Sequence, residues 1–275
     1  MWIDSIDHLC RLESYLLQGP QRIVCLTEEP TEILCALGLE ERIVGISAYS
    51  VRPAGIQNRK PVVSAFLDGS VRKIAALKPD LVIGFSDIQA DLAARLIKAH
   101  LPVVIFNQRS VTEILETIAM IARMVGAQHK GEQLVQMYRR RIARARQEAS
   151  RRRHRPAVYF EEWDEPMICA IEWVSELIEI AGGRNIFSDR AASKGARGRV
   201  VDEQEVLDAD PDVIIASWCG KPVDFDAMRD RPGFAGLSAF ATGQIHELDP
   251  SIILQPGPAS LTDGLDALCR IISAS

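Results

Sequence analysis

Two short stretches decide the fold: Leu77-Lys-Pro-Asp-Leu-Val-Ile-Gly84 and Ala209-Asp-Pro-Asp-Val-Ile-Ile-Ala216. In each of them a Pro-Asp pair ends a helical pattern, and an uninterrupted aliphatic run follows. Such a run is typical of a strand that is covered on both faces of a parallel sheet. Earlier in each half, the apolar runs Arg22-Ile-Val-Cys-Leu26 and Ala157-Val-Tyr-Phe160 precede an acidic pair and then a helical pattern. The repeated order predicts two similar α/β lobes.

The pattern along the chain sets the expected domains. Strand and helix signals alternate through residues 21–109, and a second α/β pattern fills residues 156–275. Residues 110–155 carry no strand signal, and their second part, from about His129, has the spacing of one long helix. Residues 1–20 form an N-terminal extension. The sequence therefore predicts an α/β fold of two Rossmann-like lobes, with mainly parallel sheets, joined by one long helix.

Composition narrows the class of protein. The chain has 275 residues, 47% of them hydrophobic and 25% charged, with a net charge of -5. A negative net charge argues against nucleic acid as a partner. No apolar run is long enough to cross a membrane, and residues 1–20 lack the basic start and apolar core of a secretory signal. We expect a monomer that is cytoplasmic as the sequence stands, or periplasmic if a natural signal has been removed.

Motifs of catalysis and metal binding do not occur. The sequence has no Gly-x-Ser-x-Gly turn, no phosphate-binding glycine loop and no His-Glu-x-x-His, and its six cysteines form no Cys-x-x-Cys pair. Cys25, Cys35 and Cys269 lie in apolar runs and are expected to be reduced core residues. Cys169 and Cys219 lie near predicted loops, and a chemical role for them stays open. We predict no catalytic residue, no metal ligand and no required cofactor.

Several strings carry a resemblance to a known family. They are Arg22-Ile-Val-Cys-Leu26, Ile74-Ala-Ala-Leu-Lys-Pro-Asp-Leu-Val-Ile83 and Ser175-Glu-Leu-Ile-Glu-Ile-Ala-Gly-Gly-Arg-Asn-Ile-Phe187. In order and spacing they resemble the helical-backbone substrate-binding proteins of ABC importers, in the branch of cobalamin and ferric-siderophore binders. The resemblance covers residues 21–272. It implies a ligand held between two Rossmann-like lobes that a long helix joins.

The resemblance also implies a permease partner, and here the chain departs from the family. Such importers usually carry one surface glutamate on each lobe that docks onto arginines of the permease. This chain has Arg72 at the first position and Gln204 at the second, with Glu203 and Glu205 beside it. A reversed charge weakens attraction at a docking point. We therefore expect ligand binding with no effective ABC permease partner.

The candidate ligand-binding residues follow the carboxyl ends of the predicted strands, where ligands bind in such folds. They are Glu28, Glu29, Tyr49, Phe66, Phe85, Asp87, Glu162, Trp163, Trp173, Trp218 and Cys219. The aromatic residues either contact a bulky ligand or pack the lobes. The glutamates either face the ligand or compensate a helix dipole. If acidic pairs face the ligand from both lobes, a cationic or neutral ligand such as cobalamin or another corrinoid fits best.

Three functions remain open on the sequence. The favoured one is a binding protein, not an enzyme, for a bulky corrinoid-like or metal-chelate ligand in the cleft between the lobes, without a transport role. The alternative is a cytoplasmic enzyme or accessory factor that acts on a tetrapyrrole-like or metal-chelate substrate in the same cleft. The third is an interaction module whose cleft is vestigial.

Overall fold

The computed structural model describes residues 19–65, 68–193 and 195–275, so most of the predicted extension 1–20 lies outside the described residues. The chain forms two compact units. The first holds the described residues up to Gln108 together with Leu115–Gln136, and the second holds Arg109–Ile114 and Met137–Ser275. Helices α6 (Val111–Met124) and α7 (Gln128–Ala149) contribute to both units and fill the region expected to lack strands. Treating 110–155 as a separate linker stays a prediction.

The first unit is built on a six-stranded sheet of order β4-β3-β2-β1-β5-β6. Its strands are β1 (Ile23–Cys25), β2 (Ile43–Ser47), β3 (Val62–Ala65), β4 (Asp68–Gly69), β5 (Leu81–Phe85) and β6 (Val103–Phe106). All neighbours run parallel except β3 and β4. The aliphatic run after the first Pro-Asp pair is β5, and Ile23 lies opposite Leu81 in the register. The central strands are fully buried, as a sheet covered on both faces requires.

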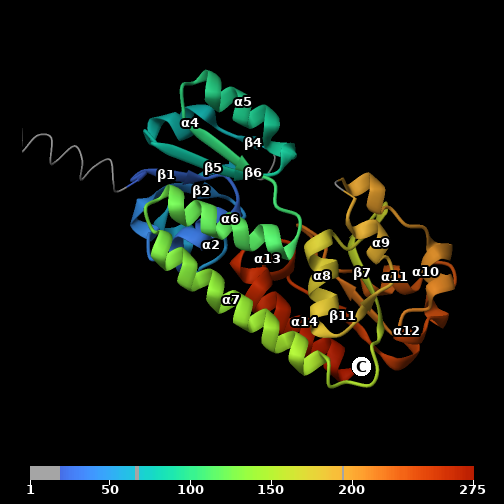
Figure 1. Ribbon diagram of the computed structural model, residues 1–275. Coiled ribbons are helices and arrows are strands. Elements are labelled where there is room, and N and C mark those ends of the chain that lie inside the picture. Colours follow the sequence, from blue (N-terminus) through green and yellow to red (C-terminus); the bar gives the residue numbers. More distant parts are fainter. Residues whose placement is uncertain (1–18, 66–67, 194) are drawn as a thin grey trace, which may run out of the picture. The chain divides into compact units, whose positions relative to one another are not determined.

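Helices cover both faces of this sheet (Figure 1). They are α2 (Glu28–Ala36), α3 (Ile56–Arg59), α4 (Val71–Ala76), α5 (Ala90–Lys98) and parts of α6 and α7, with short 3-10 turns η1 (Glu40–Arg42) and η2 (Asp87–Gln89). α4 and α5 lie on one face, where Ile74, Leu92 and Leu96 pack against Val24 and Val82 of the sheet. This apolar layer fixes the strands whose ends carry the candidate residues.

The second unit has a five-stranded sheet of order β11-β10-β7-β8, with β9 beside β7. Its strands are β7 (Ala157–Asp164), β8 (Met167–Cys169), β9 (Arg184–Asn185), β10 (Val213–Ala216) and β11 (Ile245–Glu247). The second aliphatic run after a Pro-Asp pair is β10, which is parallel to both β7 and β11. β8 alone runs antiparallel, in a hairpin with β7. The sheets of both units are thus mostly parallel, as predicted.

Helices again lie on both faces of the second sheet. They are α8 (Glu172–Ala181), α9 (Ser188–Ala191), α10 (Glu203–Ala209), α11 (Phe225–Arg229), α12 (Ser238–Thr242), α13 (Pro250–Ile253) and α14 (Leu265–Ala274), with shorter turns η3 (Ala196–Arg199), η4 (Phe234–Gly236) and η5 (Ser260–Gly264). One buried cluster joins Tyr159, Ile214, Trp218 and Phe234. α8 ends at Gly182, whose φ of 97° suits a left-handed helix cap.

Two elements begin or end elsewhere than the sequence indicates. α2 begins at Glu28, whereas the sequence predicts that the helix follows the acidic pair, so Glu28 and Glu29 form its first turn. β7 continues to Asp164 beyond the predicted 157–160. The reason is the β8 hairpin, which pairs Trp163 with Ile168 and keeps the polar end of β7 extended. Cys169, expected near a loop, is a buried residue of β8.

No helix within residues 19–65, 68–193 and 195–275 combines the length and the apolar character that a transmembrane span needs.

Candidate ligand-binding site

The first unit places a buried acidic pair just after β1. Glu28 and Glu29 are 8% and 2% exposed in the first turn of α2. Burial disfavours a charged carboxylate and raises the pKa of Glu28 to about 8, and repulsion by Glu29 adds to this. Burial also raises the pKa of Glu29 to about 7, against the opposing effect of the Thr27 hydroxyl. This pair therefore holds protons near neutral pH.

The other candidates of the first unit differ in exposure. Tyr49 follows β2 and is 47% exposed, so its ring is accessible from solvent. Phe85 is the buried last residue of β5. Asp87 is the exposed first residue of the turn η2 and accepts a hydrogen bond from the Ser86 hydroxyl at 2.9 Å. Phe66 lies outside the described residues. Among these residues, Tyr49 offers the largest free aromatic surface.

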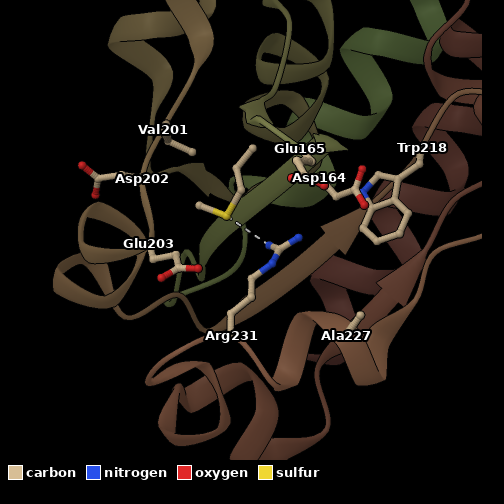
Figure 2. Close-up of a pocket in the computed structure, with 9 residues that line it drawn as sticks. Asp164, Glu165, Val201, Asp202, Glu203, Trp218, Ala227 and Arg231 are labelled. Atoms are coloured by element: carbon tan, nitrogen blue, oxygen red, sulfur yellow. Dashed lines mark hydrogen bonds between the residues drawn. The ribbon is translucent and has the colours of Figure 1, made fainter.

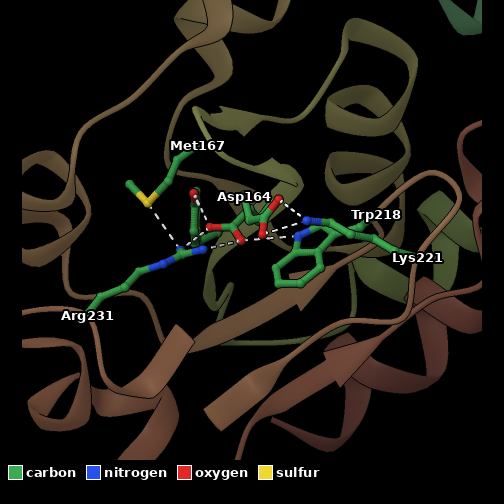
Figure 3. Close-up of polar contacts among 7 residues, drawn as sticks. Asp164, Met167, Trp218, Lys221 and Arg231 are labelled. Carbon is green, nitrogen blue, oxygen red and sulfur yellow. Dashed lines mark hydrogen bonds and ion pairs between the residues drawn. The ribbon is translucent and has the colours of Figure 1, made fainter. Parts of the chain in front are cut away.

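In the second unit the acidic pair lies within β7, and its first member is completely buried. Glu161 accepts hydrogen bonds from the Arg231 guanidinium at 2.5 and 3.0 Å, from the Tyr159 hydroxyl at 2.9 Å and from the Trp218 indole N–H at 3.2 Å (Figure 3). Burial, followed by the charge of Glu161, raises the pKa of Tyr159 well above its ordinary value, so the hydroxyl keeps its proton. Glu161 is thereby neutralised by Arg231 and fixed by three donors.

The second member of the pair is neutralised too. Arg199 contacts both carboxylate oxygens of Glu162, at 2.5 and 3.0 Å, and also donates to the backbone carbonyl of Cys169 at 2.6 Å. The Arg199 side chain is 4% exposed and that of Glu162 is 21% exposed. Both charges of this pair are therefore compensated by arginines far away in the sequence, of which Arg199 is buried and Arg231 is partly buried. Whether the acidic pairs face a ligand stays a prediction.

The three tryptophans that the structure describes are two buried residues and one partly exposed residue. Trp173 is 3% exposed and donates its indole N–H to the Ile253 carbonyl at 2.9 Å, so it packs α8 against α13. Trp218, 2% exposed, belongs to the core cluster. Trp163 is half-buried in β7 and donates to the Glu165 carbonyl at 3.0 Å. Cys219, next to Trp218, is exposed.

One lysine joins two of these tryptophans, and sequence reasoning missed it. The Lys221 ammonium lies 4.5 Å from the centre of the Trp163 ring and 4.8 Å from that of Trp218. It also contacts the carboxylate oxygens of Asp164 at 2.6 and 2.8 Å (Figure 3). Sequence reasoning passed over Arg199 and Arg231 as well, because no local spacing connects them to β7.

A pocket of about 460 Å³ opens beside this network within the second unit (Figure 2). It lies at the carboxyl end of β7 and β10, the edge where ligands bind in such sheets. Its walls come from the β7–β8 hairpin, the start of α10, and the segment around α11. The lining residues are Asp164, Glu165, Met167, Val201, Asp202, Glu203, Trp218, Ala227 and Arg231.

The positions expected to dock a permease are on the surface. Arg72 is exposed on α4 and Gln204 is exposed on α10, where its amide donates to Asp208 at 2.7 Å. Glu205 is committed to an ion pair with Arg190 and to the capping box of α10. Glu203 lines the pocket. In the part of the chain that the structure describes, no group of three or more His, Cys, Asp or Glu side chains is placed to hold a metal ion.

Comparison with known proteins gives related substrate-binding proteins. Residues 23–252 match the family described as periplasmic binding protein. An uncharacterised ABC transporter substrate-binding lipoprotein of Bacillus subtilis is 24% identical, over 98% of this chain and 85% of its own length. A vitamin B12-binding protein of Vibrio cholerae is 26% identical, over 92% of this chain and 89% of its own.

The comparison with solved structures also finds a periplasmic binding protein. The periplasmic haem-binding protein of Roseiflexus sp. RS-1 superposes with a TM-score of 0.78 at 27% identity, covering 92% of this chain and 100% of that one. The cytoplasmic location expected from residues 1–20 finds no support among these relatives, one a lipoprotein and one periplasmic. Because the family match covers most of its length and the fold agrees, the chain belongs to the periplasmic binding protein family and shares the two-lobed architecture of its ligand-binding members.

Proposed function

We propose that the protein binds a bulky corrinoid-like or metal-chelate ligand through residues at the carboxyl ends of the strands. The observation that carries this proposal is the family match over residues 23–252, joined to relatives named for vitamin B12 and haem. The exposed ring of Tyr49 supports it, because such a ring can pack on a large planar or apolar ligand face. The enzyme or accessory-factor alternative has no support among these relatives.

Titration of the purified protein tests the proposal. Dicyanocobinamide, cyanocobalamin and haemin are added separately, and binding is followed by quenching of tryptophan fluorescence and by calorimetry. We expect one of them to bind with micromolar affinity or better. If none binds at high micromolar concentration, the proposed ligand class is wrong.

A pair of variants locates the contact. Tyr49→Ala removes an exposed aromatic ring, and we expect it to weaken binding by about tenfold, the effect of losing ~1.4 kcal/mol. Ile97→Ala on α5 removes another exposed apolar side chain, 59% exposed, at a place with no predicted contact. It should leave the affinity unchanged. Trp218→Ala is less informative, because Trp218 also holds the buried Glu161.

We further infer that docking to a permease is weakened in this chain. The inference rests on Arg72, exposed where the family resemblance implies a glutamate, and on the commitment of Glu205 to Arg190. Of the acidic residues flanking Gln204, Glu203 is the one without an ion pair among the described residues. A reconstituted transport assay should show low stimulation by the native chain and higher stimulation by Arg72→Glu, most clearly at low salt. Strong ligand delivery by the native chain would overturn this inference.

A further inference from the structure

The second unit contains a cage that already binds a cation. Two indole faces, from Trp163 and Trp218, lie 4.5 and 4.8 Å from the Lys221 ammonium, and both oxygens of Asp164 contact it. Aromatic faces attract cations through the ring quadrupole, and cages of this composition recognise substituted ammonium groups. The site thus has the chemistry of an organic-cation receptor, with a side chain of the same protein as its occupant.

The walls of the cage are held in place without help from Lys221. The Trp218 indole N–H is bound to the buried Glu161 carboxylate, and the Trp163 indole N–H is bound to the Glu165 carbonyl. Trp163 also packs against the buried cluster that contains Trp218. Because these contacts fix both rings, the cage keeps its shape when the lysine leaves.

The segment that carries Lys221 is exposed and loosely packed. Lys221 follows Cys219 and Gly220, both exposed, and its own side chain is 40% exposed. Gly220 has a φ of 87°, and no heavy atom outside residues 219–221 lies within 4 Å of the position that a Cβ would take there. The lysine can therefore leave the cage without disturbing packed residues.

The neighbouring pocket favours a cation as the replacement. Asp164 and Trp218 belong both to the cage and to the pocket of about 460 Å³, whose other charged residues include Glu165, Asp202 and Glu203. Its arginine, Arg231, is neutralised by Glu161. Glu165 and Glu203 enter no salt bridge within the described parts of the chain. The pocket is thus acidic and large enough for substituents on an ammonium nitrogen.

We propose that Trp163, Trp218 and Asp164 form a binding site for a substituted ammonium group, which Lys221 occupies when no ligand is bound. A tethered side chain competes with free ligand at an effective concentration on the order of millimolar. An external ammonium ligand must therefore displace Lys221, and binding becomes stronger when the lysine is removed. Trp163 and Trp218 are also candidate contacts of the bulky ligand proposed above, but the recognition of an ammonium group rests on the contacts of Lys221 and does not require that ligand.

Choline is the probe, and Lys221→Ala is the test variant. Tryptophan fluorescence and calorimetry should show choline binding to Lys221→Ala at least about tenfold more tightly than to the native chain. Lys98→Ala, which removes an exposed lysine of α5, is the matched control and should behave like the native chain. In the Lys221→Ala background, Asp164→Asn should weaken choline binding by about fivefold or more.

The neutral isostere 3,3-dimethyl-1-butanol separates charge recognition from apolar packing. It has the shape of choline without the positive charge, so the Lys221→Ala variant should bind it much more weakly. Unfolding curves of each variant check that the fold is retained. Equal affinity of the native chain and Lys221→Ala for choline, or equal affinity of the variant for choline and the isostere, would overturn the proposal and leave the cage as an internal clamp. Neither outcome depends on the cobinamide or haemin titrations.

Discussion

The two units differ in the charge of their adjacent glutamates. Each has two adjacent glutamates, just after β1 in the first unit and within β7 in the second. Glu161 and Glu162 are paired with Arg231 and Arg199, whereas burial raises the pKa values of Glu28 and Glu29. In the second unit the glutamates keep their negative charge, and arginines compensate it. In the first unit the glutamates hold protons near neutral pH, which suppresses their charge. Similar sequence therefore does not carry similar charge in the two units.

Removing Arg231 should produce the largest change in stability. Arg231→Met leaves Glu161, which is completely buried, without its counter-ion, and breaking such a pair costs about 3–5 kcal/mol. Urea denaturation should show this loss in the free energy of unfolding. The double variant Glu161→Gln/Arg231→Met removes the stranded charge and should recover a good part of it. A single variant as stable as the native chain would mean that Arg231 does not compensate Glu161.

Arg199→Met gives a smaller loss and sharpens the comparison. Its partner Glu162 is 21% exposed, so water can solvate the carboxylate once the arginine is gone. The carbonyl of Cys169 also loses its donor. We expect a destabilisation of ~2 kcal/mol, between that of a surface ion pair and that of a fully buried one. The same urea titration measures this loss. A loss of stability equal to that of Arg231→Met would show that the partial exposure of Glu162 does not reduce the cost of an unpaired carboxylate.

Sequence reasoning reached the architecture because its signals are local. The Pro-Asp pairs followed by aliphatic runs gave β5 and β10, and helical spacing gave the long α7. The compensation of the charges of Glu161 and Glu162 could not be predicted, because their partners are distant in the sequence. Arg231 lies 70 positions from Glu161, and Arg199 lies 37 positions from Glu162. The β7–β8 hairpin did leave a local signal, Glu165-Pro166, at its turn. The candidate ligand residues stay predictions.

The first pair should make stability depend on pH. The pKa of Glu28 is about 8 in the folded state against an ordinary value of 4.5, so between these two pH values the folded protein holds a proton that the unfolded chain has released. This contribution to stability is greatest at low pH and falls as the pH rises towards about 8. Glu28→Gln cannot ionise. At pH 8.5 we expect it to be more stable than the native chain by ~1–2 kcal/mol, with no such gain at pH 4.5.

Urea denaturation at both pH values measures the effect, and Glu40→Gln is the matched control. Glu40 is paired with Arg59 at the surface, and the arginine lowers its pKa, so this variant should not gain stability at high pH. A Glu28→Gln variant whose advantage is the same at both pH values would contradict the proton-holding interpretation of the first pair.

A loss smaller than those of Arg231→Met and Arg199→Met tests how much each hydrogen-bond donor to Glu161 contributes to stability. Tyr159→Phe removes the hydroxyl that donates to Glu161 at 2.9 Å, while Arg231 and the Trp218 indole keep their contacts. The aromatic ring remains, including its edge-to-face contact with Phe187. Because the carboxylate keeps its counter-ion, we expect a loss of ~1.5 kcal/mol, the ordinary contribution of a hydrogen bond to a charged group. If Tyr159→Phe lowers the free energy of unfolding as much as Arg231→Met does, the hydroxyl and not the guanidinium stabilises the buried Glu161. The two units would then differ in hydrogen bonding and not in charge compensation.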